Sequence, residues 1–115
     1  MSGTLTPPGH APGRLVEMSA EVRAAVLVDP AGGLVAAGGA DRTQARHLAG
    51  LAHDLLATAD AAGPNEQVEA QTGGGTVFVV RDARYTLACV ARRLALPALV
   101  LYDMRQTLLG IEAAA

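Results

Sequence analysis

Three consecutive glycines, Gly73 to Gly75, precede the valine-rich stretch TVFVVRD and raise the question of a phosphate-binding loop. Such a loop needs a strand, the glycines and then a helix whose first backbone amides and dipole meet the phosphate. A Walker-type loop also needs a lysine after the last glycine. Here the following segment is typical of a strand, and the chain has no lysine. We therefore expect a turn, and neither a bound nucleotide nor another cofactor.

Histidine and aspartate side chains on the predicted central helix could serve as metal ligands. His47 and His53 are six residues apart, so their directions differ by ~120°. His47 and Asp54 are aligned, but they lie two turns apart, at ~10.5 Å. Neither pair can bind one metal ion within a single chain, so we expect no metal site there. A site built across a dimer stays conceivable.

Nucleophilic catalysis requires an activated serine, threonine or cysteine beside a base. Ser2 and Ser19 fall near the N-terminus, outside any sharp strand-to-helix turn. Cys89 lies within an apolar run, where a small buried hydrophobic residue is expected. Glu66 and Glu69 straddle the start of a predicted edge strand and should be solvated. The sequence thus predicts that the protein is not an enzyme.

Length and composition limit the other classes. The 115 residues predict one domain. Residues 1–13 should form a flexible arm and residues 14–115 the folded domain. The formal net charge is −2 and the nine cations are scattered arginines, so we expect no nucleic-acid partner. No apolar run approaches ~18 residues and no signal peptide is evident, which predicts a cytoplasmic protein without membrane insertion.

Local patterns predict the elements of this domain. Apolar runs at 23–29 and 34–39, split by Pro-Ala-Gly-Gly, favour a β-hairpin. Asp41 and Gln44 have the spacing of a capping box before a helix over 42–62, which Gly63 and Pro64 should end. The predicted core face of this helix comprises the following residues: Leu48, Ala52, Leu55 and Ala59.

Three further strands and a helix follow. Residues 66–72 alternate in polarity, as in an edge strand, whereas 76–82 and 85–93 are nearly continuous apolar runs, buried on both faces. Tight loops make neighbouring strands antiparallel. Pro97 should open the closing helix. With a short first helix before the hairpin, these elements predict an α+β sandwich of order αββαβββα around a five-stranded antiparallel sheet, with the central helix alone on one face.

Two features of this sandwich predict contact with partners. Small or neutral residues form a second line along the central helix: Ala45, Ala49, Gly50, His53 and Ala57. Gly50 costs the helix roughly 1 kcal/mol relative to alanine, which favours close approach of another backbone over drift in an alanine-rich sequence. The edge strand places Val68, Ala70 and Thr72 on one face, and it could pair with its twin in a symmetric dimer. Glu66 and Glu69 could instead protect a monomeric edge.

The chain also resembles the Roadblock family of dynein-light-chain-related modules over residues 15–112. AAVLVDPAGGLVAAGG resembles the first hairpin of the family, with Asp29 and Gly32 in the turn, and ARHLAGLAHDLLATADAAG resembles the central helix. EQVEAQTGGGTVFVVRDARYTLACVARR resembles the three-stranded meander, and LPALVLYDMRQTLLGI the closing helix. The first helix is shorter than is usual in the family.

This resemblance implies a homodimer formed through the third strand and the central helix. It also implies that the partner is a small Ras-like GTPase or a related signalling assembly, which the protein would regulate or scaffold. By the same analogy, the dimer seam or the GTPase would be faced by these residues: Arg42, Arg46, Gly50, His53 and Ala57. The alternative is a small-molecule sensor of profilin-like or PAS-like shape with a ligand between sheet and helix, although the core offers few aromatic or polar residues for a pocket.

Overall fold

A computed structural model describes residues 5–63 and 66–112 of the chain. Its first part comprises η1 (Pro8–His10), α1 (Ala11–Met18), β1 (Val22–Val28), β2 (Leu34–Gly38) and α2 (Arg42–Asp60). Its second part comprises β3 (Gln67–Thr72), β4 (Gly75–Arg81), β5 (Thr86–Ala91) and α3 (Pro97–Leu109). Apart from the short 3₁₀ turn η1, this is the predicted order αββαβββα.

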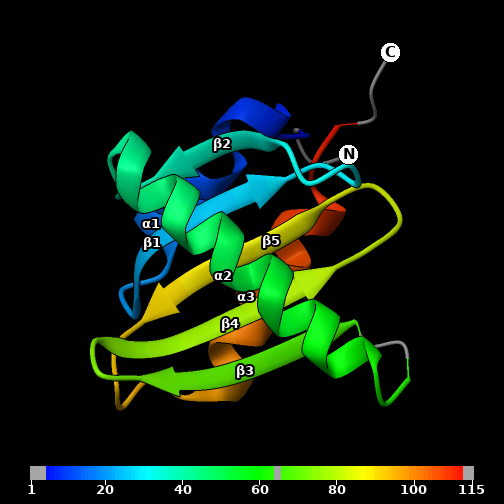
Figure 1. The fold of residues 1–115 in the computed structure, drawn as a ribbon. Coiled ribbons are helices and arrows are strands. Elements are labelled where there is room, and N and C mark those ends of the chain that lie inside the picture. The colour runs from blue at the N-terminus through cyan, green and yellow to red at the C-terminus, as the bar shows by residue number, and fades with distance from the viewer. Residues whose placement is uncertain (1–4, 64–65, 113–115) are drawn as a thin grey trace.

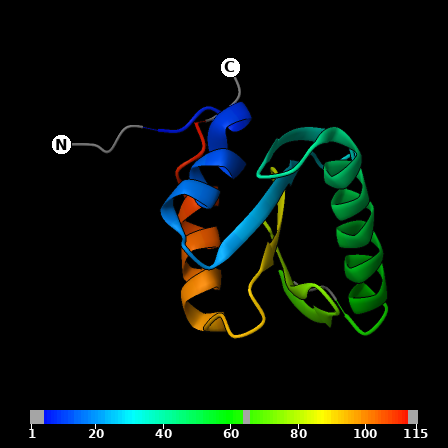
Figure 2. The ribbon, with the colours of Figure 1, turned by 90° about the vertical axis from the view of Figure 1, so that its left-hand side faces the viewer.

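The five strands form one antiparallel sheet with the spatial order β2-β1-β5-β4-β3 (Figure 1). Seen from the side, α2 alone covers one face of the sheet, and α1 and α3 cover the other (Figure 2). Both the fold class and the distribution of helices over the two faces are therefore as the sequence predicts.

Side chains of the middle strands alternate between two cores, because successive residues of a strand point to opposite faces. On β4, Phe78 is fully buried against the α1 and α3 side, whereas Val77 and Val79 are buried against α2. On β5, Cys89 is likewise buried on the α1 and α3 side, and Ala88 on the α2 side. This double burial explains why the sequence of these strands is almost continuously apolar.

The folded region begins earlier than the boundary predicted at residue 14. Helix α1 starts at Ala11, and both Ala11 and Pro12 are buried. Thr6 pairs with Ile111 through a parallel bridge, and its amide donates to the carbonyl of Gly110 at 2.7 Å. These contacts fix a proline- and glycine-rich segment whose composition alone is typical of a flexible arm. The rest of that arm, residues 1–4 with Ser2, lies outside the described residues.

Helix α2 confirms the predicted capping box. Oδ1 of Asp41 accepts from the amide of Gln44 at 2.8 Å, and Oε1 of Gln44 accepts from the amide of Asp41 at 3.0 Å. The helix ends at Asp60, two residues before the predicted end, and Pro64 of the predicted stop signal lies outside the described residues. Gly63 follows the helix with a φ of +128°, which suits glycine.

The core face of α2 is rotated relative to the prediction. The buried residues of the helix are Ala45, Leu48, Ala52 and Leu56. The predicted core positions Leu55 and Ala59 are only half-buried. Ala45, predicted for the partner-facing line, is 1% exposed. The buried residues are three, four and four positions apart, a spacing that fits one face of a helix as well as the predicted spacing does. Only packing against the sheet decides which of the two faces is buried.

Arg84 ties the β4–β5 turn to the C-terminal end of α3. Its guanidinium donates to the carbonyl oxygens of Leu108 at 2.7 Å and of Ile111 at 3.0 Å. Asp82 holds it there with an ion pair of 3.3 Å. Burial raises the pKa of Asp82, but the amides of Tyr85 and Arg84 and the Arg84 guanidinium outweigh this, so its pKa is lower than usual.

We expect Arg84→Ala to lower the free energy of unfolding by about 2 kcal/mol, because charge-assisted bonds to helix-terminal carbonyls would be lost. Urea denaturation followed by circular dichroism measures this change. Arg93→Ala, at an exposed position, is the matched control and should alter stability by less than about 0.5 kcal/mol. Equal effects of the two substitutions would contradict the structural role of Arg84.

Candidate functional site

β3 is an edge strand, as its alternating polarity predicts, with β4 as its neighbour. The amide of Arg81 donates to the carbonyl of Glu66 at 2.9 Å, which makes these two residues a hydrogen-bonded pair. Hydrogen-bonded and non-bonded pairs alternate in an antiparallel ladder. The outward-pointing backbone groups of the edge therefore belong to these residues: Gln67, Glu69 and Gln71. The side chains of Val68 and Ala70 are half-buried and that of Thr72 is exposed, and Val68 packs against the core beneath α2.

The opposite edge of the sheet is in contact with other elements. β2 packs against η1 and α1, and the backbone of Gly38 lies so near Gly13 that a Cβ atom at Gly38 would be 2.5 Å from the Gly13 Cα atom. The two edges differ in this respect, because β3 contacts β4 and α2 but neither α1 nor η1 closely. β3 is therefore the better edge for the addition of a strand from another chain.

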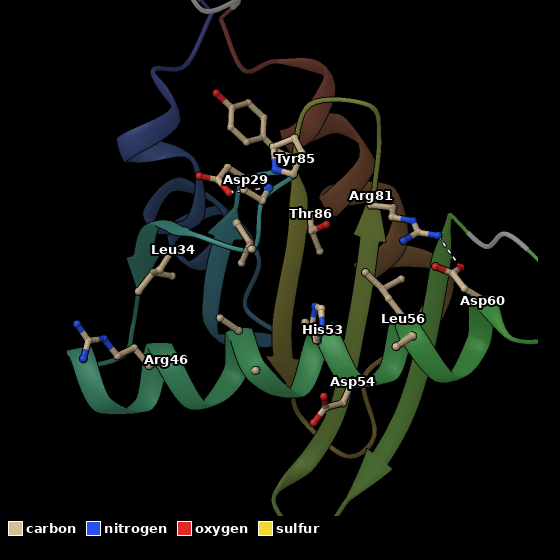
Figure 3. A pocket seen from close by; sticks show the side chains of 18 of the residues that line it. Asp29, Leu34, Arg46, His53, Asp54, Leu56, Asp60, Arg81, Tyr85 and Thr86 are labelled. Carbon is tan, nitrogen blue, oxygen red and sulfur yellow. Dashed lines mark hydrogen bonds and ion pairs between the residues drawn. The ribbon is translucent and has the colours of Figure 1, made fainter.

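An open cleft of about 1080 Å³ lies beside α2, between this helix and the ends of the β1–β2 and β4–β5 hairpins. Figure 3 shows His53 pointing from α2 into the cleft, with Asp29 and Tyr85 on the opposite wall. Arg81 and Asp60 close one end with an ion pair of 2.6 Å. The cleft is wide and partly charged, so it offers a docking face rather than an enclosed pocket.

The structure brings together most of the α2 residues that the sequence nominates. The following predicted interface residues all line the cleft: Arg42, Arg46, Ala49, Gly50, His53 and Ala57. All but the half-buried Ala49 are exposed. The predicted β3 residues Val68, Ala70 and Thr72 do not line it. The candidate interface therefore consists of two separate parts, the cleft beside α2 and the free edge of β3.

Sequence reasoning missed the far wall of the cleft. Oδ1 of Asp29 accepts from the amides of Ala31 at 3.0 Å and Gly33 at 2.8 Å, and so shapes the β1–β2 turn. The stretch Asp-Pro-Ala-Gly-Gly is a recognisable signal for such an Asx-type turn. Tyr85 and Thr86 lie across the cleft only because β5 is adjacent to β1, a long-range pairing that no local pattern shows.

Gly50 has no structural explanation within the described part of this chain. A Cβ atom built there would meet nothing within 4 Å. A glycine in a helix interior nevertheless costs roughly 1 kcal/mol relative to alanine. By contrast, Gly39 has a φ of +69° and its Cβ would collide with the carbonyl oxygen of Arg23. Space for the close approach of another backbone is therefore available at Gly50.

The exposed charges of α2 are also arranged unusually. Arg42 and Arg46 lie in its N-terminal half, and Asp54 and Asp60 in its C-terminal half. Interaction with the helix dipole favours the reverse arrangement, with anions near the N-terminus and cations near the C-terminus. The N-cap Asp41 follows this preference, and Asp60 is paired with Arg81. Arg42, Arg46 and Asp54 depart from it and line the cleft, where they can orient a bound partner.

Within residues 5–63 and 66–112, no three His, Cys, Asp or Glu side chains are grouped closely enough to hold a metal ion. Over the same residues, no helix is both long and apolar enough to cross a membrane. Glu66 and Glu69 are both exposed at the β3 edge, as the sequence predicts.

Cys89 is fully buried in the core, as predicted, and its Sγ lies 3.6 Å from the sulfur of Met104. Burial raises the pKa of its thiol to about 12. At pH 8 the thiolate fraction should thus be about 10³-fold smaller than in an unfolded chain with a pKa near 8.5. We expect Ellman's reagent to label the native protein at least about 10³-fold more slowly than the urea-unfolded protein. Rapid labelling without urea would contradict this burial.

Comparison of the whole fold with solved structures identifies its class. The Roadblock/LC7 domain from Streptomyces avermitilis superimposes with a TM-score of 0.79 at 25% identity, over 89% of this chain and 92% of that one. MglB of Myxococcus xanthus superimposes with a TM-score of 0.65 at 17% identity, over 86% and 80% of the two chains. Another MglB structure of the same fold has a tetrameric arrangement. This chain has the Roadblock/LC7 fold, as its sequence resemblance implies.

Profilin II of Acanthamoeba castellanii also matches, with a TM-score of 0.58 at 17% identity, over 89% of this chain and 93% of that one. The general layout of helices and sheet is therefore shared with profilins, and the fold alone does not define a function. No protein-family model and no curated protein matches the sequence.

Proposed function

We propose that this chain is a non-enzymatic Roadblock-type module that forms a homodimer and binds a small Ras-like GTPase, which it regulates or scaffolds. The observation that carries this proposal is the separation of two surfaces. The free edge of β3 is one, and the cleft beside α2, to which β3 contributes no lining residue, is the other. One surface can join two subunits while the other stays available for a different protein.

The β3 edge supports self-association. Backbone groups of Gln67, Glu69 and Gln71 point away from β4 and can bond a second β3 in an antiparallel pair about a twofold axis. The half-buried side chains of Leu51 and Leu55 on α2 belong to the same core as Val68 of β3. Helix α2 can therefore contribute apolar contacts beside the paired strands, as the Roadblock resemblance implies.

We expect Glu69→Pro to weaken the dimer by at least about 10-fold, because it removes an outward-pointing amide from the paired edge. The same proline should leave the β3–β4 ladder intact, since that amide does not bond β4. Sedimentation equilibrium measures the dimer constant, and thermal unfolding at dilute concentration checks the fold. Ala70→Pro, whose amide points toward β4, is the contrasting variant and should destabilise the monomer itself. An unchanged dimer constant for Glu69→Pro would remove β3 from the interface.

The cleft supports binding of a GTPase. Gly50 and Ala57 present almost no side chain, so the backbone of a partner can approach α2 closely. Arg42 and Arg46 at one end and Asp54 at the other offer charges that orient this partner. Nucleotide would be bound by the GTPase, since the glycine run of this chain is a hairpin turn with Gly73 and Gly74 at its tip.

Binding to purified Ras-like GTPases from the same organism tests this function directly. Each GTPase is loaded with GDP or with a non-hydrolysable GTP analogue and passed over the immobilised chain. We expect one of them to bind at micromolar affinity or tighter, with a preference for one nucleotide state. Absence of binding to every GTPase, together with a metabolite that copurifies with the chain, would favour the sensor hypothesis.

A further inference from the structure

Tyr85 provides the largest aromatic surface on the far wall of the cleft. Among the described residues that line the cleft, it is the only phenylalanine, tyrosine or tryptophan. Figure 3 places it beside Asp29, across the cleft from His53 on α2. Tyrosine is enriched among the residues that carry most of the binding energy of interfaces, because its ring buries a large area. The position of this ring should therefore matter to a protein that docks in the cleft.

Two neighbouring residues in the β4–β5 turn hold Tyr85 in place. Oδ1 of Asp82 accepts from the amides of Arg84 at 2.8 Å and of Tyr85 at 2.9 Å. The amide of Asp82 in turn donates to the carbonyl oxygen of Tyr85 at 3.0 Å. The guanidinium carbon of Arg84 lies 5.8 Å from the centre of the Tyr85 ring, within the range of a cation–π contact. Asp82 thus fixes the backbone of Tyr85, and Arg84 contacts its ring.

Arg84 connects this turn to the helices on the other face of the sheet. Its guanidinium is anchored on the carbonyl oxygens of Leu108 and Ile111, at the end of α3. That end is fixed as well, because the amide of Glu112 donates to the carbonyl oxygen of Thr6 at 2.9 Å. Arg84 itself is not among the residues that line the cleft. A residue outside the cleft therefore links the wall of the cleft to a firmly held part of the fold.

The carboxylate of Asp82 serves both neighbours at once, since its Oδ2 pairs with the Arg84 guanidinium while its Oδ1 accepts from the Tyr85 amide. Loss of the guanidinium would remove the partner of this carboxylate and the cation beside the Tyr85 ring. We propose that Arg84 is a positioning residue for the cleft, which holds the Tyr85 ring in the orientation that a docked partner requires. This inference rests on the proposed function of the cleft as a docking face.

Hydrogen exchange of the free full-length chain, measured by nuclear magnetic resonance, tests the positioning step without a partner. We expect Arg84→Ala to speed exchange of the Tyr85 amide at least about tenfold, because local opening of the turn becomes easier. Val100→Ala, which removes buried methyl groups near the other end of α3, is the control for general loss of stability. It should leave this exchange rate within about twofold of wild type. If Arg84→Ala does not fold, Arg84→Gln replaces it, since glutamine keeps an amide donor for the α3 carbonyl groups.

A double-mutant cycle tests the consequence for binding, by isothermal titration with the GTPase that binds the wild-type chain. Tyr85→Ala should lower the affinity at least about tenfold, and Arg84→Ala at least about fivefold. The double variant should bind within about twofold of Tyr85→Ala, because Arg84 has no further effect once the ring is absent. Val100→Ala should bind like wild type. Circular dichroism confirms that each variant is folded at the temperature of the titration.

Other outcomes would overturn the proposal. Unchanged exchange of the Tyr85 amide in Arg84→Ala would show that Arg84 does not position Tyr85. Additive losses of affinity in the double variant would mean that Arg84 acts independently of the ring. An equal loss of affinity in Val100→Ala would assign the effect to lower stability alone. If no GTPase binds the wild-type chain, the proposed function fails, whereas the exchange measurement still decides whether Arg84 positions Tyr85.

Discussion

Gly50→Arg should abolish binding of the GTPase, lowering its affinity at least about 100-fold, while the homodimer persists. An arginine at this position projects from α2 over the cleft, where the glycine offers bare backbone. Interface positions that tolerate only a small side chain behave in this way because an inserted long charged group prevents close approach. Isothermal titration with the GTPase that binds wild-type protein measures the loss.

This substitution should not destabilise the helix itself. Gly50 has open space around it, and arginine has a higher helix propensity by roughly 0.8 kcal/mol, so thermal stability should be unchanged or raised. Gly50→Ala is the matched control. It gives a similar gain in helix propensity but adds only one methyl group, so it should lower the affinity for the GTPase only modestly. If Gly50→Arg yields a monomer instead, then Gly50 belongs to the dimer seam and the division between the two surfaces is wrong.

Gly75→Ala should destabilise the fold by about 3 kcal/mol or more, the largest effect we expect from a single methylene-sized change. Gly75 has a φ of +149°, and its Cβ would collide with the carbonyl oxygen of Ala91 on β5. The neighbouring Gly74 has a φ outside the range that strains other residues, and its Cβ would meet nothing within 4 Å. Gly74→Ala is therefore a control one residue away with the same chemical change.

Urea denaturation of the two variants gives the comparison. We expect Gly74→Ala to lie within about 0.5 kcal/mol of wild type. Similar losses in both variants would mean that the glycines serve only the flexibility of the turn, and that Gly75 does not need its close contact with β5. The glycine run would then have one shared role, and its third member would carry no special constraint.

The order of elements was predictable because each of them has a strong local signal. The capping box at Asp41 and Gln44, the alternation along β3 and the apolar runs of β4 and β5 all have the expected structure. The local sequence pattern did not predict the orientation of α2 about its axis. Stripes through Leu55 or through Leu56 are equally good by spacing, and only packing on the sheet makes Leu56 the buried residue.

The candidate site was also predictable only in part, because some of its residues are brought together by long-range packing. The line containing Gly50 and His53 follows from helical spacing, so it could be found from sequence. The wall formed by Tyr85 and Thr86 depends on β5 lying next to β1, a pairing between residues about sixty positions apart. The exposure of Tyr102 and Leu109 on α3 could not be found from sequence, since apolar residues at helical spacing fit the pattern of a buried helix equally well.

The alternation of side chains along β4 has a consequence for how this small domain can diversify. Phe78 contributes to the core under α3, while its neighbours Val77 and Val79 contribute to the core under α2. A substitution can therefore adjust one helical layer while the adjacent residue keeps the other layer in place. The surfaces on the two sides of the sheet can therefore change separately over evolutionary time, because the sheet separates the two cores that support them.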